Sequence, residues 1–282
     1  MISPVKQMMS DEKWPDASIH LALVVCVIVA TCQTALGDEI NESFRDSRLN
    51  QMAFGVVGDR DLMTPSKEGL RIASTKDSRG NTGISIPQEI HGDFEIIADA
   101  TLQDFSVPAN GYGTGLAILV ENAVNHGASL QLVVMPNGTR TIVAHDFEIV
   151  NGEHQHHATT FPASSAQVIL KLQRRGNTLY YSISTDSGAT FRELHHADFV
   201  ATPIRVAQVY GQSGGEANAY DILLHSLTVT ADELVRPGQR PQVADRSRMT
   251  SLILISVLLA LVASITMWVV VRGRRSGQGD AA

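Results

Sequence analysis

Histidines crowd one short stretch of the chain and are the first residues to suggest chemistry. The segment Gly152–His157 reads GEHQHH, and His145 lies just upstream. Alternate side chains of an extended segment point to one face, so His154 and His156 can project together as imidazole ligands for a transition metal. No cysteine and no H-E-x-x-H motif accompanies them. A polar loop between strands that binds no metal is the alternative.

Carboxylates at i,i+2 spacing are the second candidates for chemistry. Asp93/Glu95 and Asp146/Glu148 would each share one face of a strand. Glycoside hydrolysis uses two carboxyl groups about 5–10 Å apart across a cleft. Turn capping and a solvated strand face explain the same spacing without catalysis. No G-x-S-x-G motif supports a nucleophilic serine. The residues therefore favour a protein without catalytic groups, with a hydrolase as the alternative.

Four side chains are candidates for contact with a sugar or another polar ligand. Tyr112, Tyr180 and Tyr210 lie close to turns that contain Gly or Asn, where an exposed ring could lie against a sugar. Arg174 and Tyr180 are expected on the solvent face of one hairpin. Aromatic residues make up 5% of the chain, so a broad aromatic platform is not expected. Packing within the fold is the alternative for each.

The segment Ser184–Phe191 matches S-x-D-x-G-x-T-F, the Asp-box of sialidase-type propellers. In such a turn the Asp accepts hydrogen bonds from backbone amides, the Gly takes a positive φ and the aromatic ring packs beneath. The pattern occurs once, whereas a propeller repeats it in several blades. We therefore expect a structural hairpin turn in a sandwich.

Short strands are the elements that must position these residues. In Leu170–Leu194 apolar and polar residues alternate on both sides of the turn Gly176-Asn177, which predicts a β-meander. The apolar run 116–120 is expected to be a central strand. Nowhere between residues 60 and 230 does a 3.6-residue period persist. Further strands are expected near residues 69–74, 84–86, 94–102, 130–134, 141–144, 204–210 and 222–230. The pattern predicts an all-β, two-sheet antiparallel β-sandwich.

Two apolar segments flank the strand region and indicate export and anchoring. Ile19–Leu36 suits a secretory signal that is cut after Gly37, or an uncleaved signal anchor. Ser251–Val271 carries no charge, is long enough to cross a bilayer, and is followed by arginines. We expect a signal peptide or signal anchor at 1–37, a polar leading segment at 38–59, the β-sandwich domain at 60–235, a Pro/Arg-containing stalk at 236–250, a transmembrane helix at 251–271 and a short basic cytoplasmic tail at 272–282.

This layout predicts a single-pass protein of the cell membrane. Its domain is extracytoplasmic, either periplasmic or at the cell surface, and its C-terminus is cytoplasmic. Cys26 and Cys32 both lie in the first apolar run, so the domain has no disulfide and depends on a hydrophobic core, as suits a bacterial envelope. A net charge of −7 without basic clusters in the domain argues against a nucleic-acid partner.

Three stretches carry a resemblance to a known fold. They are GDFEIIADATL from Gly92, the pattern R-x-G-N-x-L-x-Y-S-x-S-x-D-x-G-x-x-F from Arg174, and YDILLHSLTVTADEL from Tyr220. Together they resemble a concanavalin A-like (laminin G/lectin/glucanase-type) jelly-roll domain over roughly residues 60–235. More narrowly, they resemble an uncharacterised domain family of bacterial exported and membrane proteins. That sandwich class includes hydrolases, lectins and adhesion modules, so the resemblance implies a fold and no single activity.

The resemblance also implies what a site would contain. Glucanases of this fold carry an E-x-D-x-x-E array on one strand. Glu148–Glu153 comes nearest to it here and lacks the central carboxylate. A structural calcium ion is common in the class, and neither Asp93 nor Asp221 can be assigned to it; no other cofactor is expected. The leading hypothesis is a non-catalytic binding or structural module whose partners are the lipid bilayer and a glycan or an envelope protein. A glycan-acting hydrolase is the alternative, and the ligand stays open.

Overall fold

The computed structural model describes residues 37–46, 53–77, 80–124, 126–236 and 238–239. The expected signal and transmembrane segments lie outside these residues. In the part that is described, no helix is both long and apolar enough to span a membrane. The short 3-10 helices are η1 (Phe44–Asp46) and η2 (Arg60–Leu62). The strands are β1 (Asp38–Ser43), β2 (Gly55–Val57), β3 (Met63–Pro65), β4 (Leu70–Ser74), β5 (Asn81–Ser85), β6 (Glu89–Phe105), β7 (Thr114–Asn122), β8 (Gly127–Val134), β9 (Arg140–Val150), β10 (Glu153–Pro162), β11 (Gln167–Arg175), β12 (Thr178–Ser184), β13 (Arg192–Asp198), β14 (Ile204–Gln212) and β15 (Tyr220–Val235).

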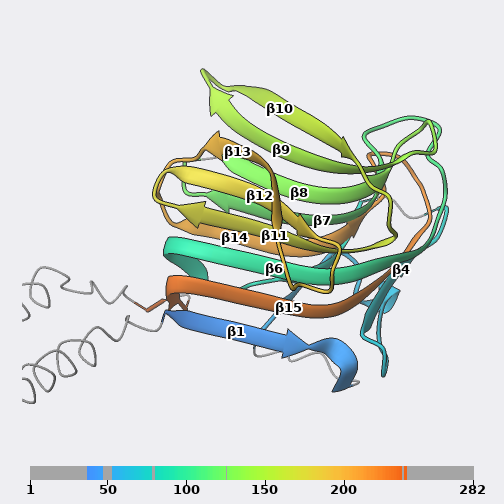
Figure 1. Ribbon diagram of the computed structural model, residues 1–282, viewed down its shortest axis with the longest axis horizontal. Coiled ribbons are helices and arrows are strands. Elements are labelled where there is room, and N and C mark those ends of the chain that lie inside the picture. Colours follow the sequence, from blue (N-terminus) through green and yellow to red (C-terminus); the bar gives the residue numbers. More distant parts are fainter. Residues whose placement is uncertain (1–36, 47–52, 78–79, 125, 237, 240–282) are drawn as a thin grey trace, which may run out of the picture. The chain divides into compact units, whose positions relative to one another are not determined.

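These strands form two antiparallel layers (Figure 1). The first layer runs β2-β5-β14-β7-β8-β9-β10. The second layer runs β13-β12-β11-β6-β15, with β1 and β4 both paired to the free side of β15 and β3 beyond β4. The layers share a single bridge, at Ile204 of β14 and Ile90 of β6. The expected all-β antiparallel sandwich is therefore confirmed.

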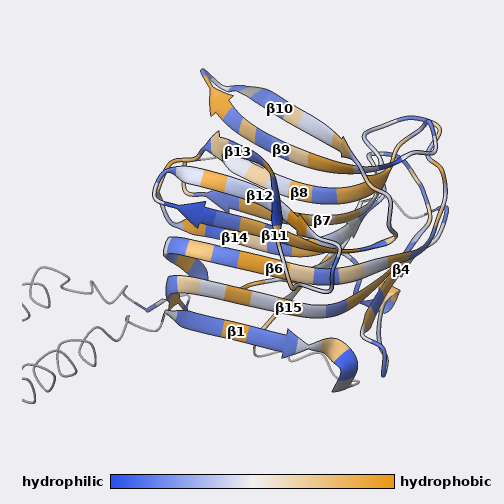
Figure 2. Cartoon of the chain, viewed as in Figure 1, coloured by the Kyte–Doolittle hydropathy of each residue, from blue (hydrophilic) through white to orange (hydrophobic). Residues whose placement is uncertain are grey.

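The core lies between the layers and follows the period-2 pattern of the sequence. Along β6 the buried residues Phe94, Ile96, Ala98, Ala100 and Leu102 alternate with more exposed ones. Figure 2 shows the same alternation as orange and blue or pale bands along the strands. Burying a Leu or Ile side chain contributes about 1.5–3 kcal/mol relative to leaving it exposed. No cysteine occurs among the described residues, so this burial is the main source of stability.

The predicted meander is present as β11, β12 and β13. Its first turn is Gly176-Asn177, in which Gly176 has φ +58° and its N–H donates to Asp93 Oδ1 at 2.7 Å. Its second turn is held by Asp186, which accepts hydrogen bonds from the hydroxyls of Ser184 and Thr190. These bonds lower the pKa of Asp186 to about 2. The Asp-box segment is thus a structural turn, as the sequence predicts.

Two regions differ from the expectation. The polar leading segment 38–59 supplies β1 and β2, and β1 pairs with β15 along its whole length. The histidines of the His-rich stretch lie not in a loop but on β10, which pairs with β9 without a register shift. Side chains 155–160 of β10 are exposed on both faces, so no alternation in the sequence marks the strand. Its backbone ladder with β9 holds it in place.

Candidate functional site

A chain of hydrogen bonds between mostly buried side chains runs along the face of the first layer that points away from the core. The Nε2 of Gln212 donates to Gln131 Oε1 at 2.7 Å, and Gln131 Nε2 donates to Ser129 Oγ at 2.7 Å. Ser129 Oγ lies 3.3 Å from His145 Nδ1, and His145 Nε2 lies 3.1 Å from His156 Nδ1. The chain thus links β14, β8, β9 and β10. We call these five residues the polar chain.

Strand alternation and two small residues make the polar chain fit. Ser129 and Gln131 occupy the positions of β8 that point away from the core, between buried leucines that point into it. Strand β7 separates β14 from β8, and it places Gly115 opposite Gln212 and Ala117 opposite Gln131. Because these β7 residues have little or no side chain, the two glutamines can meet across the strand.

The polar chain also fixes the tautomer of His145. In the arrangement that gives each proton an acceptor, the Ser129 hydroxyl donates to His145 Nδ1 and His145 Nε2–H donates to His156 Nδ1. Burial lowers the pKa of His145, and the neighbouring His156 lowers it further, while Asp146 acts in the opposite direction. His145 is therefore a neutral, oriented link at neutral pH.

The metal hypothesis for His154 and His156 finds no support in the described residues. They lie on β10 opposite Ile149 and Phe147 of β9, and His156 is stacked on His145 with ring centroids 5.3 Å apart. No group of three or more His, Cys, Asp or Glu side chains that could hold a metal ion occurs in the part of the chain described.

Tyr112 and Tyr210 come together near the other end of the polar chain. Tyr210 on β14 is 6% exposed, and burial together with the nearby Tyr112 raises its pKa to about 12. Tyr112 is 56% exposed, and its N–H donates to Gly214 O at 3.2 Å. A Cβ at Gly215 would lie 3.0 Å from the Tyr112 ring, so the glycine makes room for it. Of the two tyrosines, Tyr112 is the accessible one.

The expectation for Arg174 was wrong. Its side chain is buried, 1% exposed, rather than on the solvent face. The guanidinium donates to the carbonyls of Gly92 and Thr202, the latter at 2.7 Å, and lies 5.0 Å from the Phe94 ring centroid. Arg174 follows the alternation of the buried leucines of β11, which places its Cβ on the core side. It ties three segments together and is not available to a ligand.

Tyr180 lies on the outer face of the second layer, as expected. Its ring is half-buried, with its centroid 6.0 Å from that of His196 and 5.9 Å from the Arg175 guanidinium. The carboxylates of Asp93 and Glu95 lie near this hairpin and are already engaged. Asp93 accepts from the Gly176 N–H, and Glu95 Oε2 is 3.3 Å from Lys171 Nζ. This pair is explained by turn capping and an ion pair.

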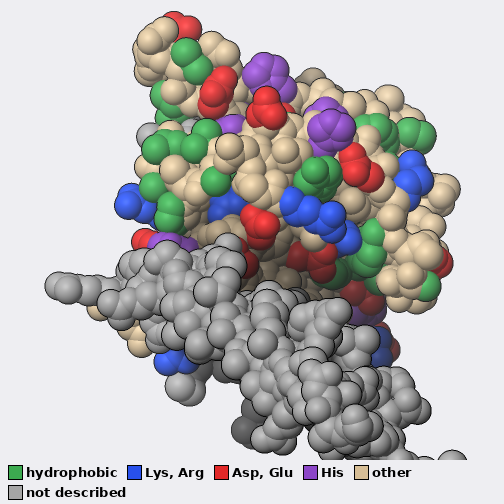
Figure 3. All heavy atoms as spheres, turned by 60° about the vertical axis from the view of Figure 1, so that its left-hand side comes forward, with side chains coloured by type: hydrophobic (Ala, Val, Ile, Leu, Met, Phe, Trp, Pro, Cys, Tyr) green, Lys and Arg blue, Asp and Glu red, His purple; other side chains and the backbone are tan. Residues whose placement is uncertain are grey.

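The other carboxylate pair lies in a cleft of about 610 Å³ where β9, β10 and β13 meet at the edge of the sandwich. We call it the edge cleft. In Figure 3, acidic and histidine side chains lie near one another in the upper part of the face drawn, and further acidic side chains are spread below them. The lining combines acidic residues, histidines, one amide and small or apolar side chains: Asp146, Glu148, Asp198, His126, His157, Asn177, Ala197, Phe199 and Val200.

Contacts inside the edge cleft fix several of these groups. His157 and Asp146 are direct partners in the β9–β10 ladder, and His157 Nδ1 lies 3.2 Å from Asp146 Oδ2. The His126 ring packs against Phe199, tilted by 37°, with centroids 4.6 Å apart. Val200 is 51% exposed and gives the cleft an accessible apolar side chain. The sequence singled out Asp146 and Glu148, but the residues from other segments gave no signal that they would join them.

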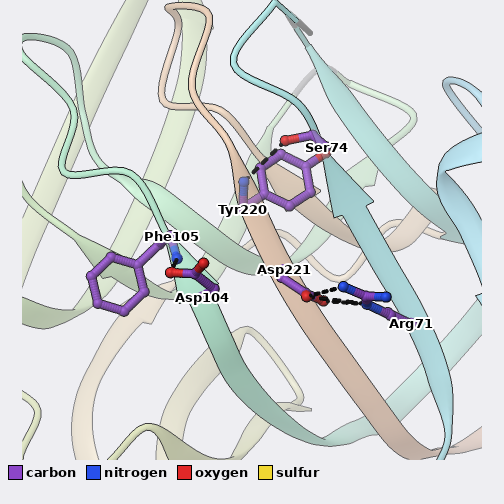
Figure 4. Close-up of polar contacts among 6 residues, drawn as sticks. All are labelled: Arg71, Ser74, Asp104, Phe105, Tyr220 and Asp221. Carbon is purple, nitrogen blue, oxygen red and sulfur yellow. Dashed lines mark hydrogen bonds and ion pairs between the residues drawn. The ribbon is translucent and has the colours of Figure 1, made fainter.

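A second hollow of about 600 Å³ lies at the junction of β4, β6 and β15 (Figure 4). Arg71 Nε donates to both carboxylate oxygens of Asp221, at 2.9 and 3.1 Å, and Nη2 donates to Oδ2 at 2.5 Å. Asp104 points away from this pair and accepts from the Phe105 N–H at 2.8 Å. Asp221 is therefore committed to Arg71, and the calcium alternative gains no ligand here.

Comparison with known proteins shows which family the chain belongs to. Residues 27–252 match the family described as "Protein of unknown function (DUF1583) C domain". The chain belongs to this family. Comparison of the DUF1583 C domain with curated proteins gives no match.

Solved structures similar to the DUF1583 C domain share its sandwich. The GH43 protein BlXynB from Bacillus licheniformis has a TM-score of 0.52 at 11% identity, covering 68% of this chain and 39% of that one. The Crh5 transglycosylase in complex with NAG has 0.51 at 13% identity, covering 70% and 85%. LamAcat from Zobellia galactanivorans has 0.51 at 10% identity, covering 70% and 98%.

At such low identity these likenesses show the fold alone, and the chain spans about two fifths of the length of the Bacillus protein. The expected concanavalin A-like jelly-roll sandwich, in a family of unknown function, is confirmed.

Proposed function

We propose that this DUF1583 C domain is a membrane-anchored, extracytoplasmic module that binds a cell-envelope glycan without catalysis, and that the edge cleft is its binding site. The composition of the edge cleft is the observation that carries the proposal. Carboxylates and an amide on its walls can hydrogen-bond sugar hydroxyls, while Val200 and the His126 ring, packed against Phe199, suit the apolar faces of a sugar. Its volume lies within the roughly 300–1,000 Å³ range of ligand pockets.

Similar folds support a glycan-related role without assigning one. The names of two similar structures refer to a GH43 protein and to a transglycosylase in complex with NAG. Because fold alone does not determine activity, the proposal rests on the residues of the edge cleft.

A glycan hydrolase is the second candidate, favoured by one observation. Asp146 and Glu148 both line the edge cleft, and two carboxyl groups flanking one bond are what glycoside hydrolysis requires. Asp146 already contacts His157, which also suits a fixed binding wall. The two functions differ in whether sugar is released.

A glycan array probed with the full-length protein in detergent tests the binding proposal. The variant Val200→Trp fills the accessible apolar part of the edge cleft and is expected to lower the affinity at least about tenfold, equivalent to about 1.4 kcal/mol. Val107→Trp is the matched control, since Val107 is similarly exposed, at 53%, and lines the hollow of Figure 4. Binding that is lost in Val107→Trp and kept in Val200→Trp would contradict the assigned site.

The double variant Asp146→Asn/Glu148→Gln distinguishes binding from hydrolysis. It keeps the size and one acceptor oxygen of each side chain, replaces the other oxygen with an NH2 donor, and removes both charges. A binding module should retain glycan affinity within a few-fold and release no sugar in either form. Sugar release by the natural chain that disappears in the double variant would instead establish the hydrolase.

A further inference from the structure

The sandwich leaves open strand edges within the described residues. In the first layer these are β2 and β10, and in the second β13, β1 and β3. An open edge exposes backbone N–H and C=O groups that can pair with a strand of another chain. Proteins usually block such pairing with charges, prolines, bulges or very short strands.

All but one of these edges carry such protection. Strands β2 and β3 have three residues each, and β3 ends in a proline. Strand β13 has a register shift against β12, and both β13 and β1 carry charges. The charged residues are Arg192, Glu193 and Asp198 on β13, and Asp38, Glu39 and Glu42 on β1.

Strand β10 lacks these devices. It has ten residues, its only Asp, Glu, Lys or Arg is Glu153 at its start, and its proline is the final Pro162. It pairs with β9 from end to end without a register shift, so no bulge twists it away. The side chains of Gln155 to Thr160 are exposed, which leaves room beside the strand for a neighbour.

We propose that β10 pairs antiparallel with β10 of a second copy of this chain, so that two first layers form one continuous sheet. A two-fold axis brings two identical strands together, so the residue on the axis meets its own copy and its neighbours meet other residues of the same strand. On β1 this would bring the three acidic side chains of each copy close to those of the other, which is unfavourable. On β10 no carboxylate, lysine or arginine is opposed between residues 154 and 162. Pairing with a second copy is therefore compatible with the β10 edge and unfavourable at the other edges.

The register of the pairing follows from symmetry. With the axis perpendicular to the sheet, directly opposed residues lie on the same face, so their numbers must both be odd or both be even. An axis at His157 would place that histidine opposite itself. An axis at Ala158 places His157 opposite Thr159 and His156 opposite Thr160. Among the allowed registers, it pairs the largest number of β10 residues without placing two histidines opposite each other. We infer the register centred on Ala158.

Charge at the centre of this register tests the pairing. The full-length protein in detergent should show about twice the protomer mass by light scattering. Ala158→Lys and Ala158→Glu each place like charges opposite one another and should raise the dimer dissociation constant about tenfold. An equal mixture of the two variants should recover the dimer, because Lys then faces Glu, and this recovery also shows that both variants fold.

Cross-linking at the same residue locates the contact. In a chain with Cys26→Ser and Cys32→Ser, the variant Ala158→Cys should form a covalent dimer on oxidation, whereas Val107→Cys at an exposed position off β10 should not. A chain that stays monomeric at all concentrations overturns the pairing and assigns the edge to an extended segment of another protein. A dimer insensitive to both charged variants also overturns it.

Discussion

Arg174 shows how one side chain can have the wrong role assigned from a sequence pattern. Its position after Leu170 and Leu172 in β11 continues the core-facing alternation, yet a guanidinium at a strand end suggests solvent. The structure resolves the conflict because backbone carbonyls from two distant segments accept its donors. Burial lowers the pKa of Arg174, while Asp93 and Asp232 act in the opposite direction. The residue is a buried clamp.

Replacing this clamp should be costly. In Arg174→Met the carbonyls of Gly92 and Thr202 lose their buried donors, and we expect the free energy of unfolding to fall by about 3 kcal/mol. Urea unfolding followed by circular dichroism measures the change. Arg175→Met, at the exposed neighbouring position, should stay within about 0.5 kcal/mol of the natural chain. Equal losses in the two variants would refute the clamp.

The polar chain belongs to the scale of elements, since it joins side chains of four strands. His145 makes this network sensitive to pH. Its folded-state pKa lies below the ordinary value of 6.5, so the unfolded chain binds more protons when the pH falls below that value. The free energy of unfolding should therefore decrease as the pH falls from 7 towards 5.

The variant His145→Gln tests this contribution. It removes the titrating group, so the decrease in unfolding free energy between pH 7 and 5 should be smaller than in the natural chain. A slope that is the same in both proteins would show that His145 does not sense pH.

Strands with a clear apolar alternation or an apolar run were predictable from the sequence, whereas β1 and β10 were not. The apolar alternation around Ile96 and Leu170 gave β6 and β11, and the apolar run in β7 gave a central strand between β8 and β14. Strand β10 has exposed side chains on both faces, and in β1 only Ile40 packs against the core, so neither shows a readable period. A strand held mainly by backbone hydrogen bonds shows little apolar alternation in its sequence.

The edge cleft was predictable only in part for a related reason. Asp146 and Glu148 stood out because both lie on one strand at i,i+2. His126, Asn177 and Asp198 reach the same cleft from other segments, and their meeting depends on how the two layers close. Local sequence patterns cannot indicate that residues so far apart in the chain become neighbours in the structure.

At the scale of the whole molecule, the first strand of the domain begins where its last strand ends. Asp38 at the start of β1 pairs with Ala231 near the end of β15, and Asp38 Oδ2 accepts from the Leu234 N–H at 2.8 Å. The first and last described strands of the chain therefore begin and end at the same end of the sandwich. This arrangement supports the proposal that the domain is held at a membrane by that end, with its edge cleft available to envelope polymers.

Fractionation of cells that express the full chain tests this anchoring. We expect the protein in the membrane fraction after alkaline carbonate washing, because an apolar run of this length prefers the bilayer core. A variant that lacks residues 251–271 should move to the soluble fraction if the signal is cleaved, and should stay with the membrane if it is a retained anchor. Protease added to intact spheroplasts should digest the domain in the natural chain, since the proposal places it outside the cytoplasm. A domain that is protected there and degraded only after lysis would contradict the proposed location, whichever form the signal takes.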